Sequence, residues 1–135
     1  HIDTVENALS NLNAQPNPTN ADFHELTLIL KNVPELGLST YSKLLYLYKI
    51  SFNYKPCLIL DQRLIKVFAR KTYSNFQELN TIRYDNDEKK YLDFLKVTNQ
   101  IAVDINTEGE NIELFLFMFG NNLKEIISKE KKPNR

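Results

Sequence analysis

Apolar residues recur at three- and four-residue intervals along most of the chain, and residues that favour turns are sparse. This spacing places apolar side chains on one face of an α-helix, and only three glycines interrupt it. The pattern therefore predicts an all-α fold, a multi-helix orthogonal bundle. Its expected helices cover about 4–14, 21–32, 39–50, 75–83 and 86–103, with one more carrying Leu64 to Phe68 and one opened by Thr107–Glu110.

Breaks between these segments follow from local chemistry. The prolines of QPNPTN end the first helix, because proline lacks an amide donor and disfavours helix before it. Asn20 or Asp22 is the expected cap of the second helix. Gly120 is expected to bend or end the last helix, and a basic tail follows.

Composition favours one domain. At 135 residues and 42% apolar content, the chain is expected to bury a single core as one helical domain over 1–135. Within it we expect a helix–hairpin–helix over about 21–50, a segment over 56–70 that carries Asp61, and C-terminal helices over 86–130. The chain opens at His1 rather than Met, so it could be a fragment of a longer one.

Cysteine and histidine usage narrows the chemistry. Cys57 is the only cysteine, which excludes a disulfide within the chain, and its place in an apolar run predicts a core residue rather than a nucleophile. His1 and His24 form no metal-ligand pattern, so neither a metal nor another cofactor is predicted. No apolar run approaches the roughly 18 residues that cross a bilayer, and no leader is recognisable. We expect a soluble cytoplasmic protein without a membrane partner.

Charges balance overall but are segregated along the chain. Residues 43–71 hold seven basic residues and one acid, Asp61, whereas residues 1–42 and 72–113 are acidic. Zero net charge argues against a general nucleic-acid binder, but the basic segment could neutralise phosphates locally. The alternative is a solvated helix surface that binds nothing.

The segment VPELGLSTYSKLLYLY reads as a helix end, a tight turn and a helix start. A proline and a glycine supply the turn. Ser39, Thr40 and Ser42 then stand near the helix N-terminus, where free amides and the helix dipole favour a phosphate. An ordinary capped helix explains the turn equally well.

The segment downstream, PCLILDQRLIKVFAR, strengthens the first interpretation. Its apolar run has no second strand candidate nearby, so we predict an extended, buried entry to Asp61, which is also a suitable N-cap. Asp61 follows Lys43 by 18 residues. Together with the turn, these residues resemble the helix–hairpin–helix DNA glycosylase superfamily, and bacterial proteins similar to 8-oxoguanine DNA glycosylases in particular. The resemblance covers about 33–70 well and 113–117 loosely.

Two alignments with that superfamily compete. Matching the turn residues puts Ser39 at the superfamily's lysine position and Lys43 one helical turn later, which implies a monofunctional enzyme or none. Matching the separation from Asp61 puts Lys43 at that position, which implies a lyase. We favour Lys43, because the lysine and the aspartate must reach one cleft.

The resemblance implies a DNA glycosylase that excises an oxidised purine such as 8-oxoguanine, with or without AP-lyase activity. Asp61 would stabilise the positive charge that develops on the sugar, and the amine of Lys43 would attack C1′. The partner would be double-stranded DNA that contains a damaged base. Its expected contacts are Ser39, Thr40, Tyr41, Ser42, Lys49 and Arg63.

The chain departs from the superfamily in one respect. Those enzymes place the cleft between the hairpin domain and a second helical domain, and the 38 residues before Ser39 are too few for a complete one. A second domain or a protein partner could therefore be missing. The alternative functions are a non-catalytic helical module that binds DNA or protein through the basic 43–71 face, and a purely structural bundle.

Overall fold

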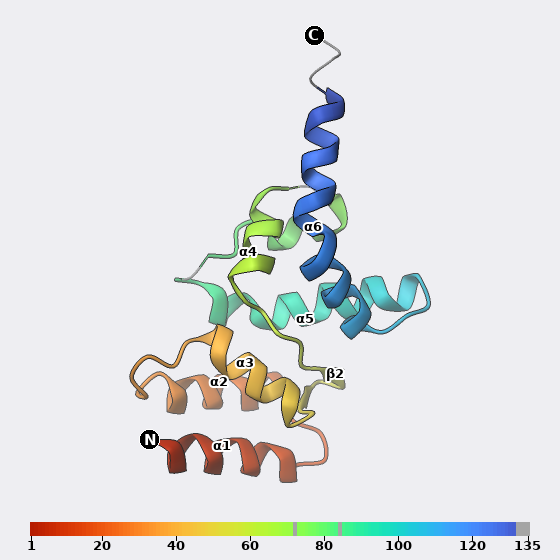
Figure 1. Cartoon of the computed structure of the whole chain (residues 1–135). Coiled ribbons are helices and arrows are strands. Elements are labelled where there is room, and N and C mark those ends of the chain that lie inside the picture. Colours follow the sequence, from red (N-terminus) through yellow and green to blue (C-terminus); the bar gives the residue numbers. More distant parts are fainter. Residues whose placement is uncertain (72, 84, 132–135) are drawn as a thin grey trace.

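The computed structural model describes residues 1–71, 73–83 and 85–131, with side chains as far as residue 120. Helices dominate this part of the chain, which confirms the all-α class (Figure 1). Within it, no helix combines the length and the apolar character needed to cross a membrane. The elements in chain order are α1 (Ile2–Ala14), α2 (Asn20–Leu30), α3 (Leu38–Leu47), β1 (Ser51–Phe52), β2 (Lys55–Pro56), α4 (Gln62–Ala69), the 3₁₀ helix η1 (Ser74–Leu79), α5 (Asp87–Asp104) and α6 (Gly109–Lys131).

The start of α2 differs from the prediction in its cap. Thr19, rather than Asn20 or Asp22, is the N-cap residue, and Asp22 stands at the third helical position. The Asp22 carboxylate accepts a hydrogen bond of 2.7 Å from the Thr19 amide, which completes a capping box. The acid therefore stabilises the helix start from within the first turn.

The connection between α3 and the apolar run contains a small β-hairpin that the sequence did not predict. β1 and β2 pair antiparallel, with Phe52 opposite Lys55. Asn53 and Tyr54 form the two-residue turn with φ of 48° and 65°, and both residues of a type I′ turn adopt this left-handed conformation. Strands of two residues are too short to show an alternating pattern, so the segment read as a loop.

The core links both ends of the molecule. Figure 1 shows α1, α2 and α3 towards one end and α4, α5 and α6 towards the other, with the chain after β2 passing between them. The Phe23 ring of α2 stacks on the Tyr91 ring of α5 at 5.3 Å and meets the Phe52 ring edge-on at 5.2 Å. These contacts join the two groups of helices into one buried cluster.

The last helix does not end at Gly120, which was one of the two alternatives expected there besides a bend. α6 continues to Lys131, and residues 132–135 of the expected basic tail lie outside the described residues. A methyl group on Gly120 would lie 2.8 Å from Cγ2 of Val67 on α4. This glycine therefore allows two helices to approach closely, rather than breaking the one it belongs to.

Candidate active site

The extended segment that leads to Asp61 is held by three helices. Residues 57–60 have no regular secondary structure, and all of them except Ile59 are buried, as predicted for an entry to the next helix. Each of three successive residues bonds to a different helix. The Leu58 carbonyl accepts from the Tyr91 hydroxyl of α5 at 2.7 Å, and the Ile59 amide donates to the Glu113 carboxyl of α6 at 2.7 Å. The Leu60 amide donates to the Ser42 hydroxyl oxygen of α3 at 3.2 Å. The backbone before Asp61 is therefore tightly positioned.

Asp61 ends this segment and is the N-cap of α4. Its Oδ1 atom accepts hydrogen bonds from the amides of Arg63 (3.0 Å) and Leu64 (3.2 Å). The capping role predicted for this residue is confirmed. The two bonds to one oxygen fix the direction of the carboxylate. The Asp61 side chain is half-buried.

Lys43 lies on the helix that contacts this same segment. Ser42 directly precedes it in α3, and Leu60 directly precedes Asp61, so the bond between Ser42 and Leu60 brings the two chain positions together. The Lys43 side chain is exposed, whereas Ser42 is fully buried. The bond therefore brings the backbone of α3 to the segment, whereas the exposed Lys43 side chain leaves the helix in a different direction from Ser42.

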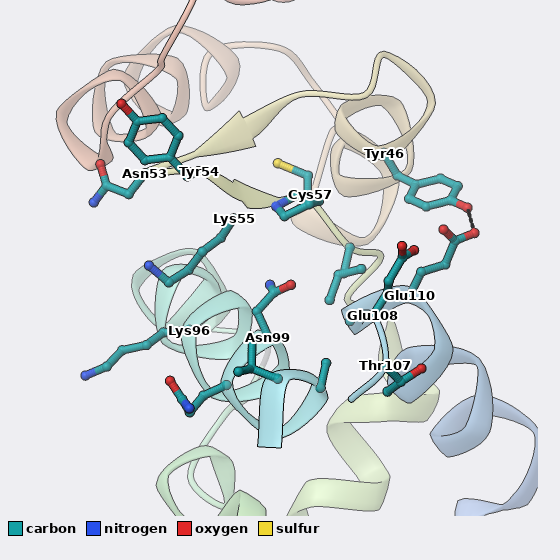
Figure 2. A pocket seen from close by; sticks show the side chains of 16 residues that line it. Tyr46, Asn53, Tyr54, Lys55, Cys57, Lys96, Asn99, Thr107, Glu108 and Glu110 are labelled. Carbon is teal, nitrogen blue, oxygen red and sulfur yellow. Dashed lines mark hydrogen bonds between the residues drawn. The ribbon is translucent and has the colours of Figure 1, made fainter. Parts of the chain in front are cut away.

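Two glutamates of α6 adjoin this region. Burial raises the pKa of Glu113 to about 7; the hydrogen bond from Ile59 opposes that rise, and the nearby charges of Glu110 and Asp61 add to it. Glu110 accepts a short hydrogen bond from the Tyr46 hydroxyl of α3, drawn as a dashed line in Figure 2. This bond raises the pKa of Tyr46. The charges of Glu110 and Asp61 therefore both act on the carboxyl group of Glu113.

A cavity of about 770 Å³ opens beside the Tyr46–Glu110 pair (Figure 2). Its walls come from the hairpin, α5 and the beginning of α6. In Figure 2 the lysines Lys55 and Lys96 lie on one side, and Glu108 and Glu110 on the other. The cavity thus offers both signs of charge to a ligand, next to the segment that carries Asp61.

The predicted DNA contacts divide into exposed and buried residues. Tyr41 and Ser42 are 0% exposed, so their side chains form part of the core and do not reach a ligand in this structure. The other four are accessible to different degrees: Thr40, Lys49 and Arg63 are exposed, and Ser39 is half-buried. The guanidinium of Arg63 lies 4.8 Å from the centre of the Phe117 ring, a cation–π contact between α4 and α6.

The N-terminus of α3 is less open to a phosphate than the sequence suggested. Gly37 is its N-cap, and the Gly37 carbonyl accepts from the amides of Thr40 and Tyr41 at 3.1 Å each, so these two amides are not free. Acidic residues from around the start of α5 line the adjacent pocket: Asp85, Asp87 and Glu88. Their negative charges would oppose the approach of a phosphate to this turn.

Cys57 is a core residue, as predicted. It is 3% exposed, and burial raises the pKa of its thiol to about 12, so the unreactive protonated form dominates at neutral pH. Over the described ranges, no three His, Cys, Asp or Glu side chains are grouped so that they could hold a metal ion. The chemistry of the region therefore rests on carboxylates, lysine and tyrosine.

The fold and this region define a class: an all-helical protein that presents an aspartate at a helix N-terminus, beside a lysine-bearing helix and within a basic segment. A family model described as "Putative 8-oxoguanine DNA glycosylase OGG-like protein" matches residues 2–117. Because the match spans most of the chain, the protein belongs to this OGG-like family. This confirms the resemblance found around residues 33–70 and extends it over residues 2–117. Searches of curated proteins and of solved structures returned no match.

Sequence reasoning missed the residues that hold the Asp61 segment. Tyr91 and Glu113 lie far along the chain, and their contacts form only when α5 and α6 pack against the segment. Glu113 did carry a usable signal, because it is a lone carboxyl group in the apolar run IELFLFMF, where a charge is costly unless it has a partner. The Tyr46–Glu110 pair carried no such signal.

Proposed function

We propose that this chain is a DNA glycosylase that excises an oxidised purine such as 8-oxoguanine, and that it cleaves the resulting site as an AP lyase. The observation that carries the proposal is the fixed position of Asp61, at the N-terminus of α4 on a segment bonded to three other helices. Membership of the OGG-like family supports the reaction class. The identity of the damaged base and the lyase step belong to the proposal.

Asp61 is assigned the electrostatic role. Breaking an N-glycosidic bond develops positive charge on the deoxyribose, and a carboxylate held beside C1′ stabilises that charge without reorganising during the reaction. The two amide bonds to Oδ1 provide this rigidity and leave the other oxygen to face the sugar. Capping and the proposed catalysis therefore both require a carboxylate that is held in a fixed orientation.

Lys43 is assigned the nucleophilic role. Its neutral amine attacks C1′, the bond from C1′ to the base breaks, and the base leaves with a proton. The nitrogen lone pair then breaks the bond from C1′ to O4′, O4′ takes up a proton, and a protonated Schiff base joins Lys43 to C1′. Removal of a proton from C2′ then expels the 3′ phosphate, and water releases the lysine. The exposed position of Lys43 beside the Ser42–Leu60 contact supports this assignment.

DNA positioning is assigned to exposed basic side chains. Arg63, Lys66 and Arg70 recur at three- and four-residue spacing on α4, so they share one face of that helix. Together with Lys49 they could neutralise backbone phosphates around the lesion. Of the contacts expected from the sequence, Ser39, Thr40, Lys49 and Arg63 remain proposed DNA contacts, because their side chains are at least partly exposed. Tyr41 and Ser42 are buried and support these residues from the core. A cytoplasmic location accompanies the proposal.

Borohydride trapping tests the lyase directly. The chain is incubated with duplexes that contain 8-oxoguanine or an abasic site, and the Schiff base is reduced to a stable adduct. We expect an adduct with the wild type and with Lys31→Gln, a control that changes an exposed lysine at the end of α2. Lys43→Gln should form none.

The remaining outcomes separate the alternatives. Excision that appears only after alkaline cleavage, without an adduct, would favour the alignment that places Ser39 at the lysine position and a monofunctional enzyme. Salt-sensitive DNA binding without excision would favour the non-catalytic module. If the chain neither binds DNA nor excises a base, the proposal is contradicted altogether.

A further inference from the structure

Glu113 occupies an environment that is unfavourable for a carboxyl group. Apolar residues surround it along α6, from Ile112 to Phe119, and its side chain is half-buried. Transfer of a carboxylate out of water is costly unless hydrogen bonds or charges compensate it. Burial raises the pKa of Glu113 to about 7, which is the thermodynamic sign of that cost. A glutamine would keep an acceptor at this position without the cost of burying a charge.

The compensation comes from the backbone that carries Asp61. The Glu113 carboxyl accepts a 2.7 Å hydrogen bond from the Ile59 amide, two residues before Asp61. One helical turn later, Phe117 packs under the Arg63 guanidinium at 4.8 Å. This face of α6 therefore lies along both the extended segment and the first turn of α4, with Asp61 between the two contacts.

Glu113 differs from the other two residues that hold the segment. Ser42 and Tyr91 bond to it through hydroxyl groups, and burial holds the pKa of Tyr91 well above its usual range, so neither changes charge near neutral pH. Glu113 can be ionised or protonated there. An ionised acceptor makes a stronger hydrogen bond to an amide than a neutral one does.

The groups that face Glu113 come from each surrounding element. Asp61 at the start of α4 and Glu110 on α6 are acidic, and both add to its raised pKa. Tyr46 of α3 and Tyr91 of α5 are also close enough for the Glu113 charge to raise their pKa values. Both tyrosines stay protonated near neutral pH, so they keep their charge where Glu113 changes its own.

We propose that Glu113 is a positioning residue of the active site, which fixes Asp61 against the sugar by holding the Ile59 amide. This inference rests on the proposed glycosylase function. Ionised Glu113 holds the segment more firmly and adds negative charge beside the developing positive charge of the sugar. Base excision therefore becomes faster as Glu113 loses its proton.

The experiment compares Glu113→Gln and Glu113→Ala with the wild type in single-turnover excision of 8-oxoguanine. Glutamine keeps a neutral acceptor, so Glu113→Gln should match the wild type near pH 6 and fall behind it by roughly tenfold near pH 8. Alanine removes the acceptor, so Glu113→Ala should be roughly 10- to 100-fold slower at both pH values. At each pH the excision rate of a variant is divided by that of the wild type, which removes the effect of other groups that titrate in both proteins. Glu25→Ala, an exposed glutamate of α2, is the control.

A readout that does not depend on activity is amide hydrogen exchange at Ile59. The exchange should stay slow in the wild type and in Glu113→Gln, and become roughly tenfold faster in Glu113→Ala. If Glu113→Ala does not fold, the test rests on Glu113→Gln, whose excision rate relative to the wild type should depend on pH. A pH-independent ratio would overturn the inference.

Other outcomes distinguish this inference from the proposed function. A wild type that excises no base would overturn the proposed function and, with it, the role of Glu113 in catalysis. An active wild type with an equally active Glu113→Ala would overturn the inference alone.

Discussion

At the residue scale, Asp61 has an observed capping role and a proposed catalytic role, which substitutions can separate. Its Oδ1 atom caps α4 through the amides of Arg63 and Leu64, and its negative charge is the feature assigned to catalysis. Capping needs an acceptor oxygen but no full charge. Catalysis, as proposed, needs the charge itself.

We therefore predict opposite profiles for two variants of Asp61. Asp61→Asn keeps the acceptor, so its free energy of unfolding should lie within a few tenths of a kcal/mol of that of the wild type. Its excision rate should fall roughly 100-fold or more. Asp61→Ala should lose excision and also about 1 kcal/mol of stability, because the cap is removed. Urea denaturation and single-turnover excision measure the two effects. An asparagine variant with full activity would remove Asp61 from the catalytic assignment.

At the element scale, α6 is positioned by its close approach to α4. The helix crosses Gly120 without ending there, and the absent side chain of that glycine leaves room for Val67. A sequence pattern shows the glycine but not the neighbour it accommodates. Of the two predictions for this glycine, a bend or an end, the end is wrong, because the residue meets a packing requirement instead.

Gly120→Ala tests this explanation. The added methyl group would lie 2.8 Å from Val67 Cγ2, so α6 must shift away, and we expect a loss of about 1–3 kcal/mol despite the better helix propensity of alanine. The matched control is Gly37→Ser, since nothing lies within 4 Å of a Cβ there and serine is a favourable N-cap. The control should be neutral or slightly stabilising in thermal denaturation. Stabilisation by Gly120→Ala would contradict the packing argument.

At the scale of the whole molecule, two buried carboxyl groups make stability depend on pH. Burial raises the pKa of Glu113 to about 7 and that of Asp87 to about 6. The folded state therefore holds these protons at pH values where the unfolded chain has released them. Their contribution is complete below the unfolded pKa values and is lost as the pH rises through the folded ones.

We predict that the free energy of unfolding falls by about 1–2 kcal/mol between about pH 5 and about pH 8, a range that allows for the contact of Glu113 with solvent. Urea denaturation at both pH values measures the change. A double variant, Glu113→Gln with Asp87→Asn, should show a clearly flatter dependence. An equal slope in the wild type and the double variant would show that these carboxyl groups are ionised in the folded state.

The sequence by itself determined the local features of this protein. Apolar spacing predicted the helices, the residues around Asp61 predicted an N-cap after an extended entry, and Cys57 in an apolar run predicted a core residue. Each depends on neighbours within a few residues, so the local pattern contains the necessary information. The family resemblance around residues 33–70 was visible for the same reason.

Only the tertiary structure decided which groups surround Asp61. Glu113, Tyr91 and Ser42 meet residues 58–60 because α6, α5 and α3 pack on one segment, and no periodicity encodes such long-range contacts. Tyr41 and the N-terminus of α3 show the reverse effect. Local sequence made them candidates for DNA contact, but the core buried Tyr41 and the acids near the start of α5 lie beside that N-terminus. Burial and proximity are properties of the packed chain, so they appear only once the helices are in place.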